Sequence, residues 1–212
     1  MVAIAEKTKR SRLSLKRIGK NIPESLIYEM MDGKIIYRKG YKEVLSGKKT
    51  IEEIMGASSL QSVVASYIAK VIFQHIDEDI YFVLINESGV NLDHRSNLAN
   101  DLAIYDKTVL KPSMITTKYT NVPPKIAIEI DVKADYEDLT ELGYIYKKTQ
   151  KLLNFGVEKV IWIITSVGKV TVSTKDKNWE TMDWSKDVEI LDNCSFNMAN
   201  YLEKQGIVVD FQ

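Results

Sequence analysis

The sequence contains almost no cysteine or histidine. Its 212 residues include one cysteine, Cys194, and two histidines, His75 and His94. A single cysteine excludes an intramolecular disulfide and a zinc site built from cysteines. Two histidines leave few candidates for a histidine-rich metal site, and we expect His75 to end the apolar stripe of a helix and His94 to be solvated in a loop.

Glycine and proline are also sparse, at ten and four residues, so neither collagen-like nor extended low-complexity structure is expected. No apolar run reaches the length that spans a membrane, and no secretory signal is recognisable. We therefore expect a cytoplasmic protein without a membrane partner. Hydrophobic residues make up 45% of the chain and charged residues 27%, which is typical of a soluble globular protein.

The chain has no net charge, but its charge is unevenly distributed. Residues 1–20 hold seven lysines and arginines against Glu6 alone, so they carry a charge of +6 and the remaining residues carry −6. A basic arm of this kind can bind a polyanion, or it can be a solvated, flexible terminus. Both interpretations remain open at this point.

The length suits a single domain, which we place at residues 21–212 after the basic arm. Strand–helix–strand spacing between residues 125 and 165 predicts a crossover between parallel strands. The predicted fold is α/β, with a mixed central β-sheet flanked by helices. Periodicity predicts helices over residues 22–31, 59–75 and 136–154, the last with Leu142 in its inner stripe, and strands over residues 34–38, 80–86, 101–106, 125–133, 159–165, 169–174 and 188–191, with a loop over residues 91–97.

Residues 123–135, PPKIAIEIDVKAD, are the most informative stretch. Because side chains alternate along a strand, Glu129, Asp131 and Lys133 are expected on one face, with β-branched apolar residues behind them. This pattern is typical of a solvated edge strand, whose charges discourage pairing with other edges. It is also typical of a strand that binds a divalent metal, which relieves the repulsion between neighbouring carboxylates.

A second acidic strand makes the metal interpretation specific. If the strand that contains Asp101 pairs with the strand that contains Glu129, then Asp101, Glu129 and Asp131 can bind Mg²⁺ or Mn²⁺ together. Such a metal lowers the pKa of a bound water and stabilises the charge that develops on a phosphodiester during hydrolysis. A nearby lysine can orient the nucleophile or neutralise the phosphate.

Asp101 followed by Asp131-Val132-Lys133 resembles the pattern of the PD-(D/E)xK superfamily, which is restriction-endonuclease-like. Four further matches are similar to the Uma family of proposed endonucleases. Residues 28–33 (YEMMDG) resemble its YELIDGE opening, residues 123–129 (PPKIAIE) its PPDLVIE segment, and residues 158–164 (EKVIWII) its EYWLVD strand. Lys148, eight residues before Gly156, matches its helix lysine. The resemblance covers residues 24–170 and implies a restriction-endonuclease-like core and magnesium-dependent cleavage of DNA.

The sequence departs from these patterns at several positions. Asn100 replaces the proline of the motif, and Gln61 stands where many family members have a helix histidine. By alignment the second acid is Glu129, whereas by acid-x-Lys spacing it is Asp131. The lysine that the resemblance implies is either Lys133, which follows that spacing, or Lys148 on the helix.

Three functions remain in competition: a metal-dependent endonuclease, a non-catalytic module that binds nucleic acid or protein, and a structural domain. An enzyme requires Asp101, Glu129 and a lysine ammonium to converge on one site. A nuclease implies DNA as the partner. Cutting both strands of a duplex usually requires two sites, so a homodimer is possible.

Overall fold

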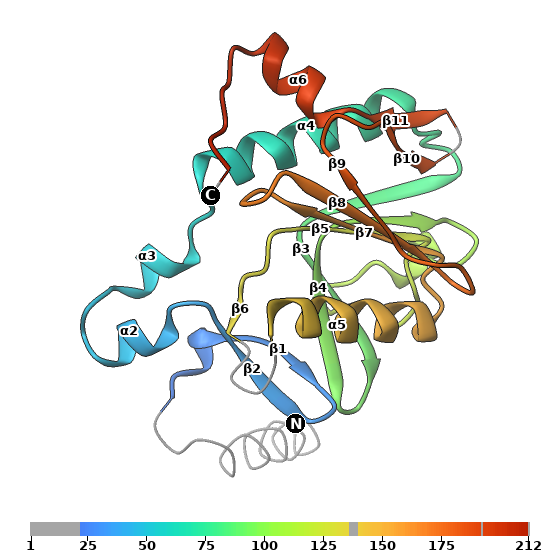
Figure 1. Cartoon of the computed structure of the whole chain (residues 1–212). Coiled ribbons are helices and arrows are strands. Elements are labelled where there is room, and N and C mark those ends of the chain that lie inside the picture. The colour runs from blue at the N-terminus through green and yellow to red at the C-terminus, as the bar shows by residue number, and fades with distance from the viewer. Residues whose placement is uncertain (1–21, 136–139, 192, 212) are drawn as a thin grey trace.

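A computed structural model describes residues 22–135, 140–191 and 193–211 (Figure 1). Its main feature is a nine-stranded mixed sheet with the strand order β6-β2-β1-β4-β5-β7-β8-β9, in which β3 also pairs with β4. Helices pack on both faces of this sheet, so the predicted α/β class with a mixed sheet flanked by helices is confirmed. The basic arm predicted at residues 1–20 lies outside the described residues.

The first two strands form a hairpin. A 3₁₀ turn, η1 (Glu24–Leu26), leads into β1 (Ile27–Met31), which pairs with β2 (Lys34–Arg38). The helix predicted over residues 22–31 is therefore wrong, while the strand at 34–38 is confirmed. The turn explains the difference: Asp32 and Gly33 have φ angles of 55° and 77°, and this Asp-Gly pair connects antiparallel strands by a left-handed turn.

The next two strands form a long hairpin, β3 (Tyr81–Asp93) and β4 (Ser96–Asp106). The loop predicted over residues 91–97 is wrong for most of its length, because strand pairing continues to Asp93 and resumes at Ser96. His94 is exposed at the tip, as expected. Two non-glycine residues of β3, Asn86 and Glu87, have left-handed φ angles of 69° and 54°, and the register shifts there.

The centre of the sheet is β5 (Ile126–Ile130), which runs antiparallel to β4 and parallel to β7 (Lys159–Ile164). The crossover helix α5 (Glu141–Phe155) connects β5 to β7, which confirms the predicted crossover. The strand predicted over 125–133 is too long. It ends at Ile130 because Asp131 has a φ of 59°, and the chain then forms the short β6 (Ala134–Asp135) beside β2.

The two long helices cover opposite faces of the sheet (Figure 1). Helix α4 (Ser59–His75) packs on Ile126, Ile128 and Ile130, and α5 packs on the alternate residues of the same strands. Leu142 does not belong to the inner stripe of α5, because it is 74% exposed. Thus β5 has an apolar row under α4 and a row that contains Glu129 under α5.

The remaining elements extend these layers. Strands β8 (Lys169–Thr174) and β9 (Glu180–Asp183) continue the sheet, and β10 (Val188–Leu191), β11 (Cys194–Phe196) and α6 (Met198–Lys204) pack beside α4. Short helices α2 (Tyr41–Leu45) and α3 (Ile51–Met55) precede α4, and the 3₁₀ turn η2 (Pro112–Met114) follows β4. Among the helices of the described ranges, none is long and apolar enough to cross a membrane.

Candidate active site

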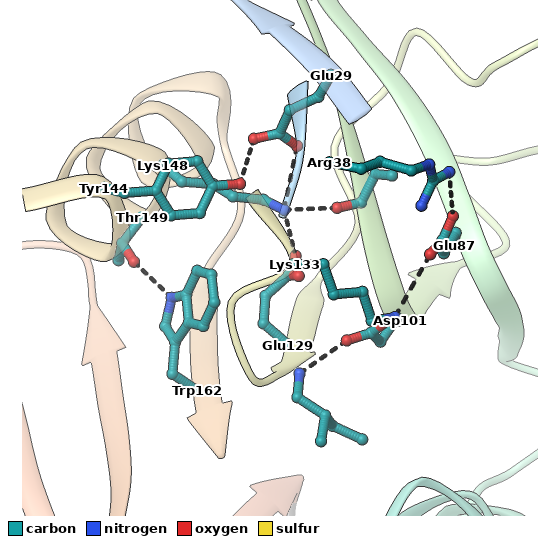
Figure 2. A network of polar contacts seen from close by, with 12 residues as sticks. Glu29, Arg38, Glu87, Asp101, Glu129, Lys133, Tyr144, Lys148, Thr149 and Trp162 are labelled. Atoms are coloured by element: carbon teal, nitrogen blue, oxygen red, sulfur yellow. Dashed lines mark hydrogen bonds and ion pairs between the residues drawn. The ribbon is translucent and has the colours of Figure 1, made fainter. Parts of the chain in front are cut away.

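Asp101 and Lys133 meet at the end of β5. Lys133 lies just beyond the strand, and its Nζ donates to Oδ1 of Asp101 at 2.6 Å. The other carboxylate oxygen, Oδ2, accepts the backbone N–H of Ile130 at 2.8 Å. The Asp101 side chain thereby fixes the position at which β5 ends, and it holds the predicted lysine beside the predicted acid (Figure 2).

Lys133 also contacts a carboxylate that the sequence did not single out. Glu87 Oε1 lies 3.4 Å from Lys133 Nζ, and Glu87 Oε2 accepts a hydrogen bond from Arg38 Nη2 at 3.3 Å. Burial lowers the pKa of Lys133, but Asp101 and then Glu87 outweigh it, so the pKa is raised above its ordinary value. The ammonium therefore remains charged at neutral pH.

Glu129 lies in a separate, fully buried network under α5. Its Oε1 is 3.1 Å from Nζ of Lys148, and the two side chains are 1% and 0% exposed. Lys148 also lies 3.3 Å from Glu29 Oε2 and donates to the carbonyl oxygen of Ala99 at 2.7 Å. Tyr144 donates to the other oxygen of Glu29. The Lys148 ammonium is thus shared by the carboxyl groups of Glu29 and Glu129 (Figure 2).

Burial dominates the electrostatics of this network. It raises the pKa of Glu129 to about 8, although the Lys148 ammonium opposes this shift. Burial also lowers the pKa of Lys148, but Glu129 and Glu29 reverse this, and the pKa is raised well above its ordinary value. Because Lys148 stays charged and balances one carboxylate, Glu129 is expected to retain a proton near neutral pH.

Asp131 does not lie on the face predicted for it. Its left-handed backbone ends the alternation of β5, and both of its oxygens are bonded to Thr165. Oδ1 accepts the backbone N–H of Thr165 and Oδ2 accepts its hydroxyl, each at 2.7 Å. The structure thus brings Asp101 to Lys133 and Glu129 to Lys148, whereas Asp131 fastens the loop after β5 to the end of β7.

Two surface hollows adjoin the Asp101–Lys133 pair. One, of about 430 Å³, lies beside α4 and is lined by Gln61, Glu87, Asp101 and Lys133 together with apolar and small side chains. The other, of about 490 Å³, also includes Gln61 and Lys133, with Asp131 and Thr165 on its wall. Lys133 thus borders both hollows, and a ligand in either one can reach its ammonium.

Asp101 and Glu129 are the acids whose strand positions bear on a divalent cation site. In the antiparallel register of β4 and β5, Leu102 pairs with Ile128. The next positions toward the end of β5, Asp101 and Glu129, therefore lie opposite each other. Proteins often bind Mg²⁺ through one or two carboxylates, with waters and substrate completing the shell. Oε1 of Glu129 lies 3.1 Å from the Lys148 ammonium, so a cation at this oxygen would share it with Lys148.

The fit is limited to these two acids. Both oxygens of Asp131 are already bonded to Thr165, so this carboxylate is a poor third ligand. Across residues 22–135, 140–191 and 193–211, no three side chains of His, Cys, Asp or Glu gather into a group that could hold a metal ion. Asp101 and Glu129 resemble magnesium ligands in type and strand position, but the oxygens of Asp101 are engaged as fully as those of Asp131, so a cation would have to displace existing contacts.

Comparison with known proteins bears on the fold. No protein-family model matches the sequence, and none of the curated proteins does. A crystal structure from Anabaena variabilis ATCC 29413, described as a putative nuclease belonging to DUF820, superposes with a TM-score of 0.60 and 15% sequence identity, covering 87% of this chain and 94% of the other. This chain has a nuclease-like fold. At this identity the similarity concerns the fold and does not assign the chain to the Uma family.

Sequence analysis does not predict two contributors to this candidate site, Glu87 and Arg38. Glu87 lies just after the apolar strand predicted at 80–86, in a polar stretch, Asn-Glu-Ser-Gly, that interrupts β3. That interruption was a signal for a bulge, because polar residues and glycine mark irregular points in a strand. Arg38 carried no local signal, since its role depends on strand order.

Proposed function

We propose that the protein is an endonuclease that hydrolyses phosphodiester bonds of DNA at a site formed by Asp101, Glu129 and Lys133. The observation that carries this proposal is the meeting of Asp101 and Lys133 from separate segments beside two hollows. Glu129 lies on the next strand, and the nuclease-like fold is consistent with the arrangement. The proposed substrate is DNA, whose phosphates carry the charge that an ammonium attracts.

Lys133 has the position of a group that acts on the substrate. Its side chain is 26% exposed and borders both hollows, whereas Lys148 has no exposed surface. We assign Lys133 the role of contacting the phosphate and the attacking water, where its charge opposes the negative charge that develops in the transition state. Lys148 acts indirectly, by orienting the side chain of Glu129.

Asp101 and Glu129 are the proposed ligands of Mg²⁺ or Mn²⁺. A cation held there would supply a water of lowered pKa and would stabilise charge on the phosphate. The protein's part is to present the carboxylates. Asp101 is held by the backbone of Ile130, and Glu129 by its contact with Lys148. Because the pKa of Glu129 is raised, a cation near neutral pH would have to displace the proton of that carboxyl, which the Lys148 ammonium favours.

A plasmid-cleavage assay with Mg²⁺ or Mn²⁺ tests the proposal. Lys133→Ala is expected to lower turnover by a factor on the order of a hundred to ten thousand, because it removes a group that stabilises the transition state. Lys125→Ala is the matched control, since Lys125 pairs with Glu158 at the opposite end of the same strand region. Absence of cleavage by the wild type on supercoiled, linear and single-stranded DNA with either metal would contradict the proposal.

A second candidate is a module that binds nucleic acid or protein without catalysis. It is favoured by one observation: both oxygens of Asp101 and both oxygens of Asp131 already have partners within the chain. A carboxylate that is fully engaged in this way can serve structure alone. DNA binding that is retained while every metal fails to support cleavage would favour this candidate.

A further inference from the structure

Glu87 occupies an irregular point of the sheet. The register between β3 and β4 shifts between Ile85 and Ser88, which places Asn86 and Glu87 in a bulge. Both have left-handed backbone, which is uncommon for residues other than glycine and costs free energy. Bulges re-aim side chains and are frequent beside active sites. Here the bulge directs Glu87 toward Lys133.

Arg38 holds the Glu87 carboxylate in that direction. Its Nη2 donates to Oε2, which leaves Oε1 of Glu87 facing Lys133 at 3.4 Å. Arg38 also lies over the ring of Tyr28, 5.4 Å from the centroid, and its side chain is 16% exposed. The guanidinium is therefore itself fixed. Residues from β2, β3, the loop after β5 and β4 form the chain Arg38–Glu87–Lys133–Asp101 (Figure 2).

Lys133 consequently contacts two carboxylates from different strands. Asp101 is the nearer, at 2.6 Å, but Asp101 is also a proposed metal ligand, and an oxygen given to a cation is lost to the ammonium. Glu87 is the other carboxylate that Lys133 contacts in the described part of the chain. A lysine without either partner would gain side-chain freedom, since a long flexible side chain is costly to hold in one place.

We infer that Glu87 is a positioning residue that keeps the Lys133 ammonium at the hollow when Asp101 is engaged with metal or substrate. This inference rests on the proposed nuclease function and extends it. Glu87 does not touch the reacting atoms. It determines where Lys133 lies, and Arg38 and the bulge determine where Glu87 lies.

Glu87→Gln tests the inference without changing the shape of the side chain. The matched control is Glu158→Gln, which removes a carboxylate 2.9 Å from Lys125. Each variant is acetylated with acetic anhydride in the presence of Mg²⁺, the condition in which Asp101 is engaged, and the rate at each lysine is followed by mass spectrometry. Lys133 is expected to react faster in Glu87→Gln and unchanged in Glu158→Gln, and Lys125 the reverse. Slow acetylation of Lys148, which has no exposed surface, shows that each variant is folded.

Cleavage kinetics supply the second readout. Glu87→Gln is expected to lower kcat by between about tenfold and a hundredfold with little change in KM, because misplacing a catalytic group mainly affects the chemical step. If Glu87 had a merely structural role, its substitution would leave kcat of the folded variant unchanged.

The outcomes separate the two claims. Unchanged acetylation of Lys133, or unchanged kcat, in a Glu87→Gln variant beside an active wild type overturns the positioning role alone. A wild type that cleaves no DNA overturns the proposed function, and the positioning role with it.

Discussion

Lys148 is a single buried side chain that contacts polar groups from several strands. The sequence marked it as a lysine that matches a family position, but its amphipathic helix gave no indication that it would be entirely buried. Its ammonium meets Glu129, Glu29 and the Ala99 carbonyl. A buried charge is tolerated when such partners satisfy it, and removing it leaves the partners uncompensated.

Replacing Lys148 by methionine is therefore expected to lower the free energy of unfolding by about 3–5 kcal/mol, because the buried Glu29 carboxylate loses its counter-charge and Glu129 loses a polar partner. Urea denaturation followed by circular dichroism measures the change. Lys125→Met serves as the control. It removes a partly exposed ion pair and is expected to cost at most about 1 kcal/mol. Equal effects of the two substitutions would show that burial of Lys148 contributes little.

Glu129 gives the protein a pH-dependent stability. Its pKa is raised in the folded state to about 8, so the folded protein binds this proton more tightly than the unfolded chain does. The stabilisation is present at low pH, below the ordinary carboxyl pKa, and is lost as pH rises toward 8. Unfolding measured between pH 5 and pH 8 should show a decline of at most about 1.4 kcal/mol per pH unit from this group.

Glu129→Gln isolates that contribution. An amide does not titrate, so the decline between pH 5 and pH 8 should become shallower than in the wild type. A wild type and a variant with parallel profiles would show that the proton is not held at Glu129.

The secondary-structure elements differ in how clearly the sequence predicts them. Helix α4 and strands β7, β8 and β10 follow local periodicity, and the structure agrees with them. The helix predicted over residues 22–31 is instead strand β1, which ends in the Asp32-Gly33 hairpin turn. Turn residues determined the structure there, since they require left-handed backbone that a helix lacks.

The site was predictable only in part, for a related reason. Asp101 and Glu129 lie on neighbouring strands, which is the pairing that the metal interpretation requires. Alternation then failed at Asp131, whose left-handed conformation is held by Thr165, a residue 34 positions later. Partners such as Arg38 and Glu87 meet through strand order and a bulge, and neither is encoded in a local pattern.

Gly33 tests the hairpin element. Alanine at this position would have to adopt a φ of 77°, and its Cβ would lie 3.3 Å from Arg95 Nε. Gly33→Ala is therefore expected to lower the free energy of unfolding by about 1 kcal/mol or more. Gly56→Ala is the control, because Gly56 has a φ of −73° and its Cβ would meet a single backbone oxygen at 4.0 Å. Thermal unfolding should show a lower Tm for the first variant. Equal Tm values would show that the left-handed turn does not determine the stability of the hairpin.

At the scale of the whole molecule, the hairpin and the sheet centre are expected to differ in local stability. Strands β5 and β7 are paired on both sides and covered by helices, whereas the described pairing of β1 with β4 is Met30 with Asn97. Elements with fewer cross-strand bonds open more readily. Hydrogen exchange by mass spectrometry should therefore show slower exchange in residues 126–130 and 159–164 than in residues 27–38. Uniform exchange would mean that the domain opens as one unit.

The contact between Glu29 and Tyr144 joins residues 115 positions apart. A ribosome adds about 5–20 residues per second, so Glu29 emerges on the order of ten seconds before its partners on α5 exist. During that interval its carboxylate has water as its partner, and the hairpin cannot assume its final place. During synthesis, therefore, the first strands of this chain cannot complete their buried network until α5 has been made.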